Sequence, residues 1–235
     1  MNLLLLSNST TQGYTYLEHA EQDIKDFFGT KPLNIAFIPY AGVTVNYNDY
    51  EAKVKNVFSK LNYNLKSVHQ VDNPKSLLME ADAVAVGGGN TFRLLQKMYD
   101  FDLIDLIKER VLNGMPYIGW SAGSNLACPT IRTTNDMPIV QPKSFDAFKF
   151  VPFQINPHYL DSHPEGFHGE TREQRLMEFV EINPNLWVVG LREGSILKVI
   201  DNKIELLGNK PARIFKKGIE PFEITNESNT SFLWD

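Results

Sequence analysis

The stretch "MPYIGWSAGSNLACPT", residues 115–130, joins a strand pattern to a helix pattern at one sharp corner. Residues 116–120 form a short apolar run that predicts a buried strand, and the segment that follows Ser121 predicts a helix. Gly119 and Gly123 flank Ser121 in the order Gly-x-Ser-x-Gly, which leaves room for a tight turn between the two elements. A strand that feeds directly into a helix is a building unit of α/β folds, so this corner indicates an α/β protein.

The residues before this corner alternate between short apolar runs and longer segments of helical period. We expect strands at residues 2–6, 33–39, 65–68, 83–86 and 116–120, and helices at about 15–28, 48–60, 74–80 and 91–112, the last broken near Asp100. This alternation predicts crossover connections and a mainly parallel sheet covered by helices on both faces. The expected fold is therefore a three-layer, flavodoxin-like α/β sandwich formed by a single domain over residues 1–235.

The second half of the sequence is less regular. A loop-rich stretch at 129–150 precedes a strand-like run at 150–155 and a loop at 156–170. A helix from about 172 to 181 follows, because Thr171 and Gln174 resemble a capping box and Asn183-Pro184 ends the pattern. A strand at 186–191 and a terminal antiparallel hairpin formed by residues 195–208 complete the prediction.

Composition excludes several classes of function. The chain of 235 residues is 43% hydrophobic and 22% charged, which suits a compact core, and its net charge of -5 argues against a nucleic-acid-binding surface. The apolar start "MNLLLL" lacks a basic region and is too short for a signal peptide or a membrane span. Cys128 is the only cysteine, so the chain forms no internal disulfide and we expect a cytoplasmic protein.

Ser121 is the candidate nucleophile, because the turn would expose its hydroxyl at the carboxyl edge of the sheet, where α/β proteins bind ligands. Such a serine needs a base, and His158 in "INPHYLD" follows a strand-like run that ends at the same edge. An acid should orient the imidazole, and three residues on loops could reach it. They are Asp136, Asp161 and Glu193, and the residues alone do not rank them.

The turn "VGGGN", residues 86–90, is the second informative corner. Consecutive glycines after a buried strand let the backbone approach a ligand and point N–H groups at it. A dinucleotide site is disfavoured, because Phe92 occupies the position of the third glycine of that motif. We expect the N–H of Gly88 or Gly89 to join the N–H of Ala122 in an oxyanion hole.

A competing cluster lies in "DSHPEGFHGE", where four side chains could ligate a metal. They are Asp161, His163, His168 and Glu170. Their spacing is loose and differs from that of helical zinc motifs, so we predict no metal and no cofactor.

Five blocks of the sequence, "LLLLSNST", "VGGGNTF", "YIGWSAGSNLACPTIRTTNDMPIV", "INPH" and "GETREQR", resemble the peptidase E family of alpha-aspartyl dipeptidases, serine peptidase family S51. The resemblance spans roughly residues 1–200. It implies a class I glutamine amidotransferase-like fold and metal-free cleavage of dipeptides with an N-terminal aspartate. It assigns the charge relay to Ser121, Asp136 and His158, and so favours Asp136 over Glu193. One position departs from the family, which has alanine where this chain has Ser124.

Selection of aspartate requires a cation for its side-chain carboxylate. Arg172 and Arg132 are the candidates, and we expect Arg172, at the start of a capped helix, to bind the substrate. Asn90 is expected to contact the substrate because of its position after the glycines. The resemblance alone suggests a homodimer. The alternatives are a cyanophycinase-like peptidase, an esterase or other serine hydrolase of the same fold, and a non-catalytic amidotransferase-like binding module.

Overall fold

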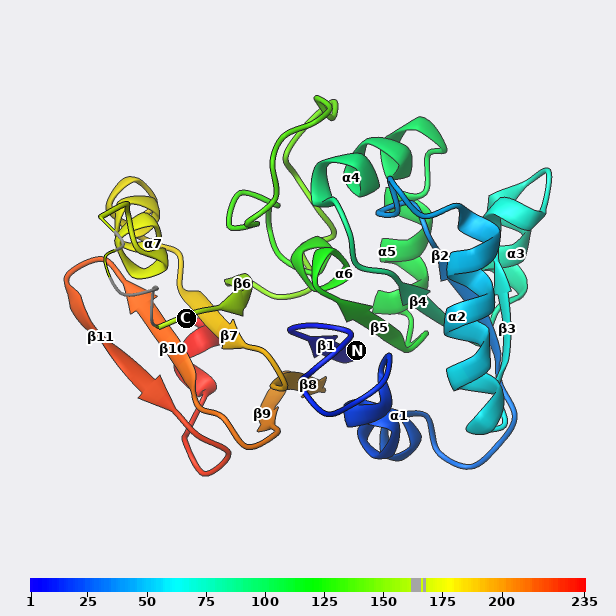
Figure 1. The fold of residues 1–235 in the computed structure, drawn as a ribbon, viewed down its shortest axis with the longest axis horizontal. Coiled ribbons are helices and arrows are strands. Elements are labelled where there is room, and N and C mark those ends of the chain that lie inside the picture. The colour runs from blue at the N-terminus through cyan, green and yellow to red at the C-terminus, as the bar shows by residue number, and fades with distance from the viewer. Residues whose placement is uncertain (162–165, 167) are drawn as a thin grey trace.

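A seven-stranded sheet forms the centre of the protein, in a computed structural model that describes residues 1–161, 166 and 168–235 (Figure 1). Its strands are β1 (Asn2–Leu6), β2 (Asn34–Ile38), β3 (Asn64–Ser67), β4 (Ala83–Val86), β5 (Tyr117–Trp120), β8 (Ile196–Ile200) and β9 (Lys203–Leu207). They run in the order β3-β2-β4-β5-β1-β8-β9. The first five strands of this order pair in parallel, and β8 and β9 add an antiparallel edge. The predicted, mainly parallel sheet is confirmed.

Helices cover both faces of this sheet. They are α1 (Glu21–Phe28), α2 (Tyr47–Lys60), α3 (Pro74–Glu80), α4 (Thr91–Asp100), α5 (Ile104–Leu112) and α6 (Ala122–Leu126), with short 3-10 helices η1 (Glu18–Ala20) and η2 (Val68–Gln70). A third 3-10 helix, η3 (Ser231–Trp234), instead contacts Trp187 and Phe222 through Phe232. Successive residues of β1 point to opposite faces: Leu3 and Leu5 pack in the core under α3, α4, α5 and α6, whereas Leu4 and Leu6 pack in the core under α1 and α2. The three-layer prediction is therefore confirmed. No helix within the described ranges is long and apolar enough to cross a bilayer.

A second, four-stranded sheet lies beside the main one and was not predicted (Figure 1). It contains β6 (Gln154–Tyr159), β7 (Val188–Arg192), β10 (Ala212–Lys216) and β11 (Ile219–Ile224), in the order β11-β10-β7-β6. Helix α7 (Arg172–Ile182) packs on it through Leu176 and Val180, which contact a small core around Phe215. The hairpin of β8 and β9 is thus not the end of the fold, because two further strands extend this second sheet.

Strand β6 differs from its prediction and carries a bulge. It begins at Gln154 rather than at residue 150, since Pro152, which has no N–H, lies in a bend before it. The pairing with β7 shifts register between Asn156 and Tyr159, and His158 within this bulge has a left-handed φ of 53°. Bulges re-aim side chains, and this one lies at the end of β6 next to the main sheet.

Candidate active site

Ser121 lies in a strained turn between β5 and α6. Its backbone has φ 53° and ψ -111°, a conformation that costs on the order of 1–3 kcal/mol for a residue other than glycine. The turn is tight on both sides, because a Cβ at Gly119 would lie 2.6 Å from the carbonyl carbon of Gly123, and one at Gly123 would lie 2.2 Å from the carbonyl oxygen of Val86. The sequence pattern around Ser121 therefore has a steric cause, and the turn is the predicted strand-to-helix corner.

Ser124, in the first turn of α6, bonds to the backbone below this turn. Its buried hydroxyl lies 2.7 Å from the carbonyl oxygen of Leu6 and 3.0 Å from that of Gly119. We expect Ser124→Ala to lower stability by about 1 kcal/mol, or a Tm shift of roughly 2–4 °C, since one hydrogen bond is lost. Calorimetry and a parallel kinetic assay check this, with kcat unchanged. A folded variant with a large loss of kcat would show that Ser124 affects the chemistry.

His158 lies against Ser121, as predicted. Its Nε2 is 3.0 Å from Ser121 Oγ, so a proton can pass directly between the two atoms. The bulge in β6 is held by Ser7 at the end of β1, whose Oγ accepts from the His158 backbone N–H at 2.9 Å and donates to the Leu191 carbonyl at 2.7 Å. Ser7 thus connects three strands beneath the imidazole.

Glu193 is the carboxylate that contacts His158. Its Oε1 lies 2.7 Å from His158 Nδ1, on the ring nitrogen opposite the one that faces Ser121. The turn that carries Glu193 follows β7 and is tied to the end of β1, because Gly194 N–H donates to Asn8 Oδ1 at 2.8 Å and Ser7 N–H donates to the Ser195 carbonyl at 3.1 Å. The main sheet therefore positions a carboxylate that comes from the second sheet.

Asp136 does not contact His158, and its predicted place in the charge relay is wrong for this structure. Its Oδ2 accepts hydrogen bonds from Thr91 N–H at 2.7 Å, Thr91 Oγ1 at 2.5 Å and Thr134 Oγ1 at 3.0 Å. The N-terminus of α4 holds this carboxylate away from the imidazole, in agreement with the preference of helix N-termini for negative charge. Asp136 still lines the same cleft as Ser121. The third candidate acid, Asp161, pairs with Arg192 instead.

The glycine turn after β4 lies beside Ser121, as predicted. A Cβ at Gly88 would be 3.1 Å from the Ser121 Cβ, and Gly89 has a φ of +135° that side chains rarely adopt. Ala122 is the first residue of α6, a position whose N–H has no carbonyl partner within its own helix. Gly88 and Gly89 line the same cleft as Ser121, and Ala122 directly follows Ser121, so the N–H groups of these three residues are the candidates to stabilise a negative oxygen there.

These elements border a cleft of about 610 Å³. Besides Ser121, His158 and Asp136, its wall includes Ser9, Tyr16, Ala41, Gly42, Val43, Thr44, Val45, Tyr50, Lys53, Gly88, Gly89, Asn90 and Ile139. Tyr50 and Lys53 come from α2 and Tyr16 from the loop after β1, and none of the three was predicted. In the sequence, an aromatic residue at helical spacing is typical of a core position, so no signal marked Tyr50.

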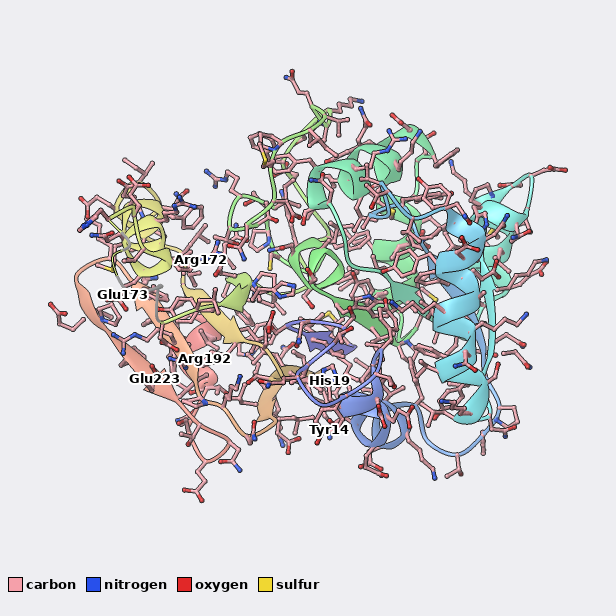
Figure 2. The ribbon with its side chains drawn as sticks, in the orientation of Figure 1. Tyr14, His19, Arg172, Glu173, Arg192 and Glu223 are labelled. Atoms are coloured by element: carbon pink, nitrogen blue, oxygen red, sulfur yellow. The ribbon has the colours of Figure 1, made fainter. Side chains whose placement is uncertain are left out.

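Asn90 lines the cleft, whereas the two candidate arginines do not border it. Asn90 caps α4, accepting from Arg93 N–H at 3.0 Å, and donates to the Met137 carbonyl at 2.9 Å. Arg172, at the start of α7 (Figure 2), donates to Asn135 Oδ1, and burial and the nearby Arg175 lower the pKa of its guanidinium. Arg132 is exposed and lies 5.4 Å from the centre of the Phe179 ring.

The Asn135 contact connects Arg172 to the backbone next to His158, because Asn135 Nδ2 donates at 2.6 Å to the carbonyl of Pro157, which precedes His158. Arg172 is thus connected through Asn135 to the bulge in β6 that carries His158.

The competing metal cluster does not assemble among the described residues. Asp161 binds the guanidinium of Arg192 through two hydrogen bonds of 2.5 and 2.6 Å, which hold the pKa of this carboxyl below its usual value. Arg192 also pairs with Glu223 across the second sheet (Figure 2). His163 lies outside the described residues, and no group of three or more His, Cys, Asp or Glu within them is placed to hold a metal.

The fold and this site define a class, the α/β proteins that present a serine, a histidine and an acid at a strand-to-helix turn on the carboxyl edge of a parallel sheet. Within that class the chain belongs to peptidase family S51, which matches residues 3–207. It is a peptidase.

Relatives of known name agree with this assignment. The chain is 51% identical over 231 residues to Peptidase E of Nostoc sp. (strain PCC 7120), covering 98% of this chain and 96% of that protein. It is 48% identical to Peptidase E of Streptomyces coelicolor over 236 residues, covering 100% and 96%. A crystal structure of a peptidase from an acI-B1 Actinobacterium shares the fold, with a TM-score of 0.68 at 18% identity, over 97% of this chain and 95% of that one.

Proposed function

We propose that the protein is a serine dipeptidase that hydrolyses dipeptides with an N-terminal aspartate. The observation that carries the proposal is the continuous line from Glu193 through His158 to Ser121, with contacts of 2.7 and 3.0 Å, which ends in a cleft. The name Peptidase E, carried by relatives about half identical to this chain, supports a peptide as substrate.

The proposed reaction proceeds through an ester on Ser121. His158 Nε2 takes the hydroxyl proton as Ser121 Oγ attacks the aspartyl carbonyl, and Glu193 stabilises the imidazolium that forms. The negative oxygen accepts hydrogen bonds from Ala122 N–H and from Gly88 or Gly89 N–H. His158 then gives its proton to the leaving amino group, and water activated by the same imidazole hydrolyses the aspartyl ester.

Two charges of the substrate need partners. Asp136 lines the cleft with a carboxylate that is fixed through Oδ2, and we assign it to the free α-amino group of the substrate. We assign the aspartyl side-chain carboxylate to Arg172, which lies outside the cleft wall but whose guanidinium contacts Asn135, the residue before Asp136, so the substrate side chain would have to extend past Asp136 to reach it. Asn90, at the same wall, can add a hydrogen bond through its amide.

A substrate panel tests the proposed function. Hydrolysis of Asp-Leu, Glu-Leu, Asn-Leu and N-acetyl-Asp-Leu should be measured with and without a chelator. Cleavage of Asp-Leu alone, indifferent to chelator, is the expected result, because the other three peptides alter the side-chain charge or length, or remove the free amine. Preferential hydrolysis of simple esters would identify an esterase, and absence of any cleavage by folded protein would favour a binding module.

Arg172→Ala should reduce kcat/KM for Asp-Leu by about ten- to a hundredfold, since a charge-assisted hydrogen bond contributes roughly 1.5–3 kcal/mol. Steady-state kinetics check this. The matched control is Arg175→Ala on the same helix, because Arg175 is exposed and pairs with the exposed Glu170. Equal kinetics for the two variants would contradict the assignment of Arg172 to the substrate carboxylate.

A further inference from the structure

We propose that Tyr50 is a positioning residue for the oxyanion hole, with a hydroxyl that fixes the Gly88–Gly89 peptide so that Gly89 N–H faces the reacting carbonyl. The inference deepens the proposed function and rests on it. Tyr50 comes from α2, on the opposite side of the sheet from α6, and its hydroxyl lies 2.9 Å from the carbonyl oxygen of Gly88.

The contacts of the Tyr50 hydroxyl determine where its proton points. The oxygen lies 2.9 Å from the Gly88 carbonyl, 3.2 Å from Trp120 Nε1 and 3.3 Å from the Tyr16 hydroxyl. A carbonyl can only accept and an indole N–H can only donate, so the single phenolic proton of Tyr50 goes to Gly88. Tyr16 must then donate to Tyr50. The hydroxyl is fully hydrogen-bonded, with one donated and two accepted bonds.

Because the peptide group is planar, the hydrogen bond to the Gly88 carbonyl also fixes the direction of the Gly89 N–H. In a planar trans peptide the C=O of one residue and the N–H of the next point in opposite directions. Because Tyr50 holds the Gly88 carbonyl toward α2, the N–H of Gly89 points away from α2. Both glycines border the cleft beside Ser121. A peptide between two glycines has few steric barriers to flipping. The hydrogen bond from the Tyr50 hydroxyl to the Gly88 carbonyl therefore serves to fix the orientation of this peptide.

The residues around Tyr50 hold its ring in place and keep its hydroxyl protonated. Tyr50 is 6% exposed, and its ring packs edge-on against Phe37 at 5.1 Å between ring centres. Burial raises the pKa of the Tyr50 phenol, so it remains a donor at physiological pH. A Cβ at Gly87 would lie 2.5 Å from the Tyr50 hydroxyl, which means that the absence of a side chain at this position makes room for the phenol.

Tyr50→Phe should lower kcat for Asp-Leu by about ten- to a hundredfold with little change in KM, less than the loss of a whole oxyanion donor. The matched control is Tyr63→Phe, because Tyr63 is also buried and donates to a backbone carbonyl, that of Gly29, away from the cleft. Gly87→Ala is an independent variant, since it displaces the phenol without altering Tyr50, and should reproduce the loss of kcat. Thermal melts establish that each variant is folded.

Two readouts separate positioning from a general loss of structure. The Gly89 amide proton should shift downfield in NMR spectra when a fluorophosphonate modifies Ser121, and this shift should shrink in Tyr50→Phe but not in Tyr63→Phe. The rate of that modification should fall about tenfold in Tyr50→Phe. If kcat, modification rate and amide shift all match those of Tyr63→Phe, the proposal is overturned. Because modification of Ser121 needs no peptide, it tests Tyr50 even if the wild type cleaves no aspartyl dipeptide.

Discussion

Replacing Ser121 by alanine should reduce kcat/KM for Asp-Leu by about 10⁴- to 10⁶-fold, because the nucleophile and its base act as a unit and loss of the nucleophile removes the ester pathway. The residual rate would come from the oxyanion donors and substrate binding alone. Progress curves at high enzyme concentration measure this loss. The fluorophosphonate adduct seen by mass spectrometry on the wild type should be absent from the variant.

Two controls show that the loss is chemical. Ser124→Ala, three residues along α6, should keep its activity and its adduct, since Ser124 bonds only to backbone beneath the turn. Calorimetry should show that Ser121→Ala still binds Asp-Leu, because the groups assigned to its charges are unchanged. Activity within about tenfold of wild type would instead mean that Ser121 is a turn residue and not the nucleophile.

The main sheet could be predicted from the sequence because its strands are buried on both faces and its helices are amphipathic. The bounds expected for β1, α3 and β4 agree with the structure, and the break near Asp100 separates α4 from α5. These elements are each specified by local patterns. Their parallel arrangement then brings the turns after β1, β4 and β5 to one edge, which is how Ser121 and the glycines could be placed together.

The second sheet could not be predicted in the same way. Strand β11 has exposed or half-exposed residues at five of its six positions, so no strong periodicity marks it. Strand β6 contains Pro157 and a bulge, both of which disturb the alternation expected of a strand. Pairing among β6, β7 and β10 depends on contacts between distant parts of the chain rather than on local preference.

The choice between the candidate acids depended on the second sheet, which the sequence did not predict. Asp136 and Glu193 both lie on loops, and only the position of β7 relative to β1 decides which carboxylate reaches His158. The resemblance favoured Asp136, and the hydrogen bonds favour Glu193. Tyr50 was missed for a related reason, since its contact with Gly88 joins residues 38 positions apart.

The roles of the two carboxylates can be separated by kinetics. Glu193→Gln should lower kcat by about a thousandfold, because the neutral amide cannot stabilise the imidazolium and can hold the wrong tautomer of His158. The effect should be smaller than for a fully buried acid, since the side chains of His158 and Glu193 are 40% and 44% exposed and water partly solvates the pair. Measurement of kcat and KM for Asp-Leu over a range of pH checks this.

Asp136→Asn is the matched change, because it also converts a carboxylate in the site to an amide. It should act mainly on KM, raising it about ten- to a hundredfold, since a charge-assisted bond to the substrate amine is lost while the Ser121–His158 contact stays intact. Asn can still accept from Thr91 N–H through its carbonyl oxygen, so the start of α4 should remain in place. The opposite pattern, with kcat lost in Asp136→Asn and kept in Glu193→Gln, would require a rearranged site in which Asp136 leaves α4 and replaces Glu193 on the imidazole.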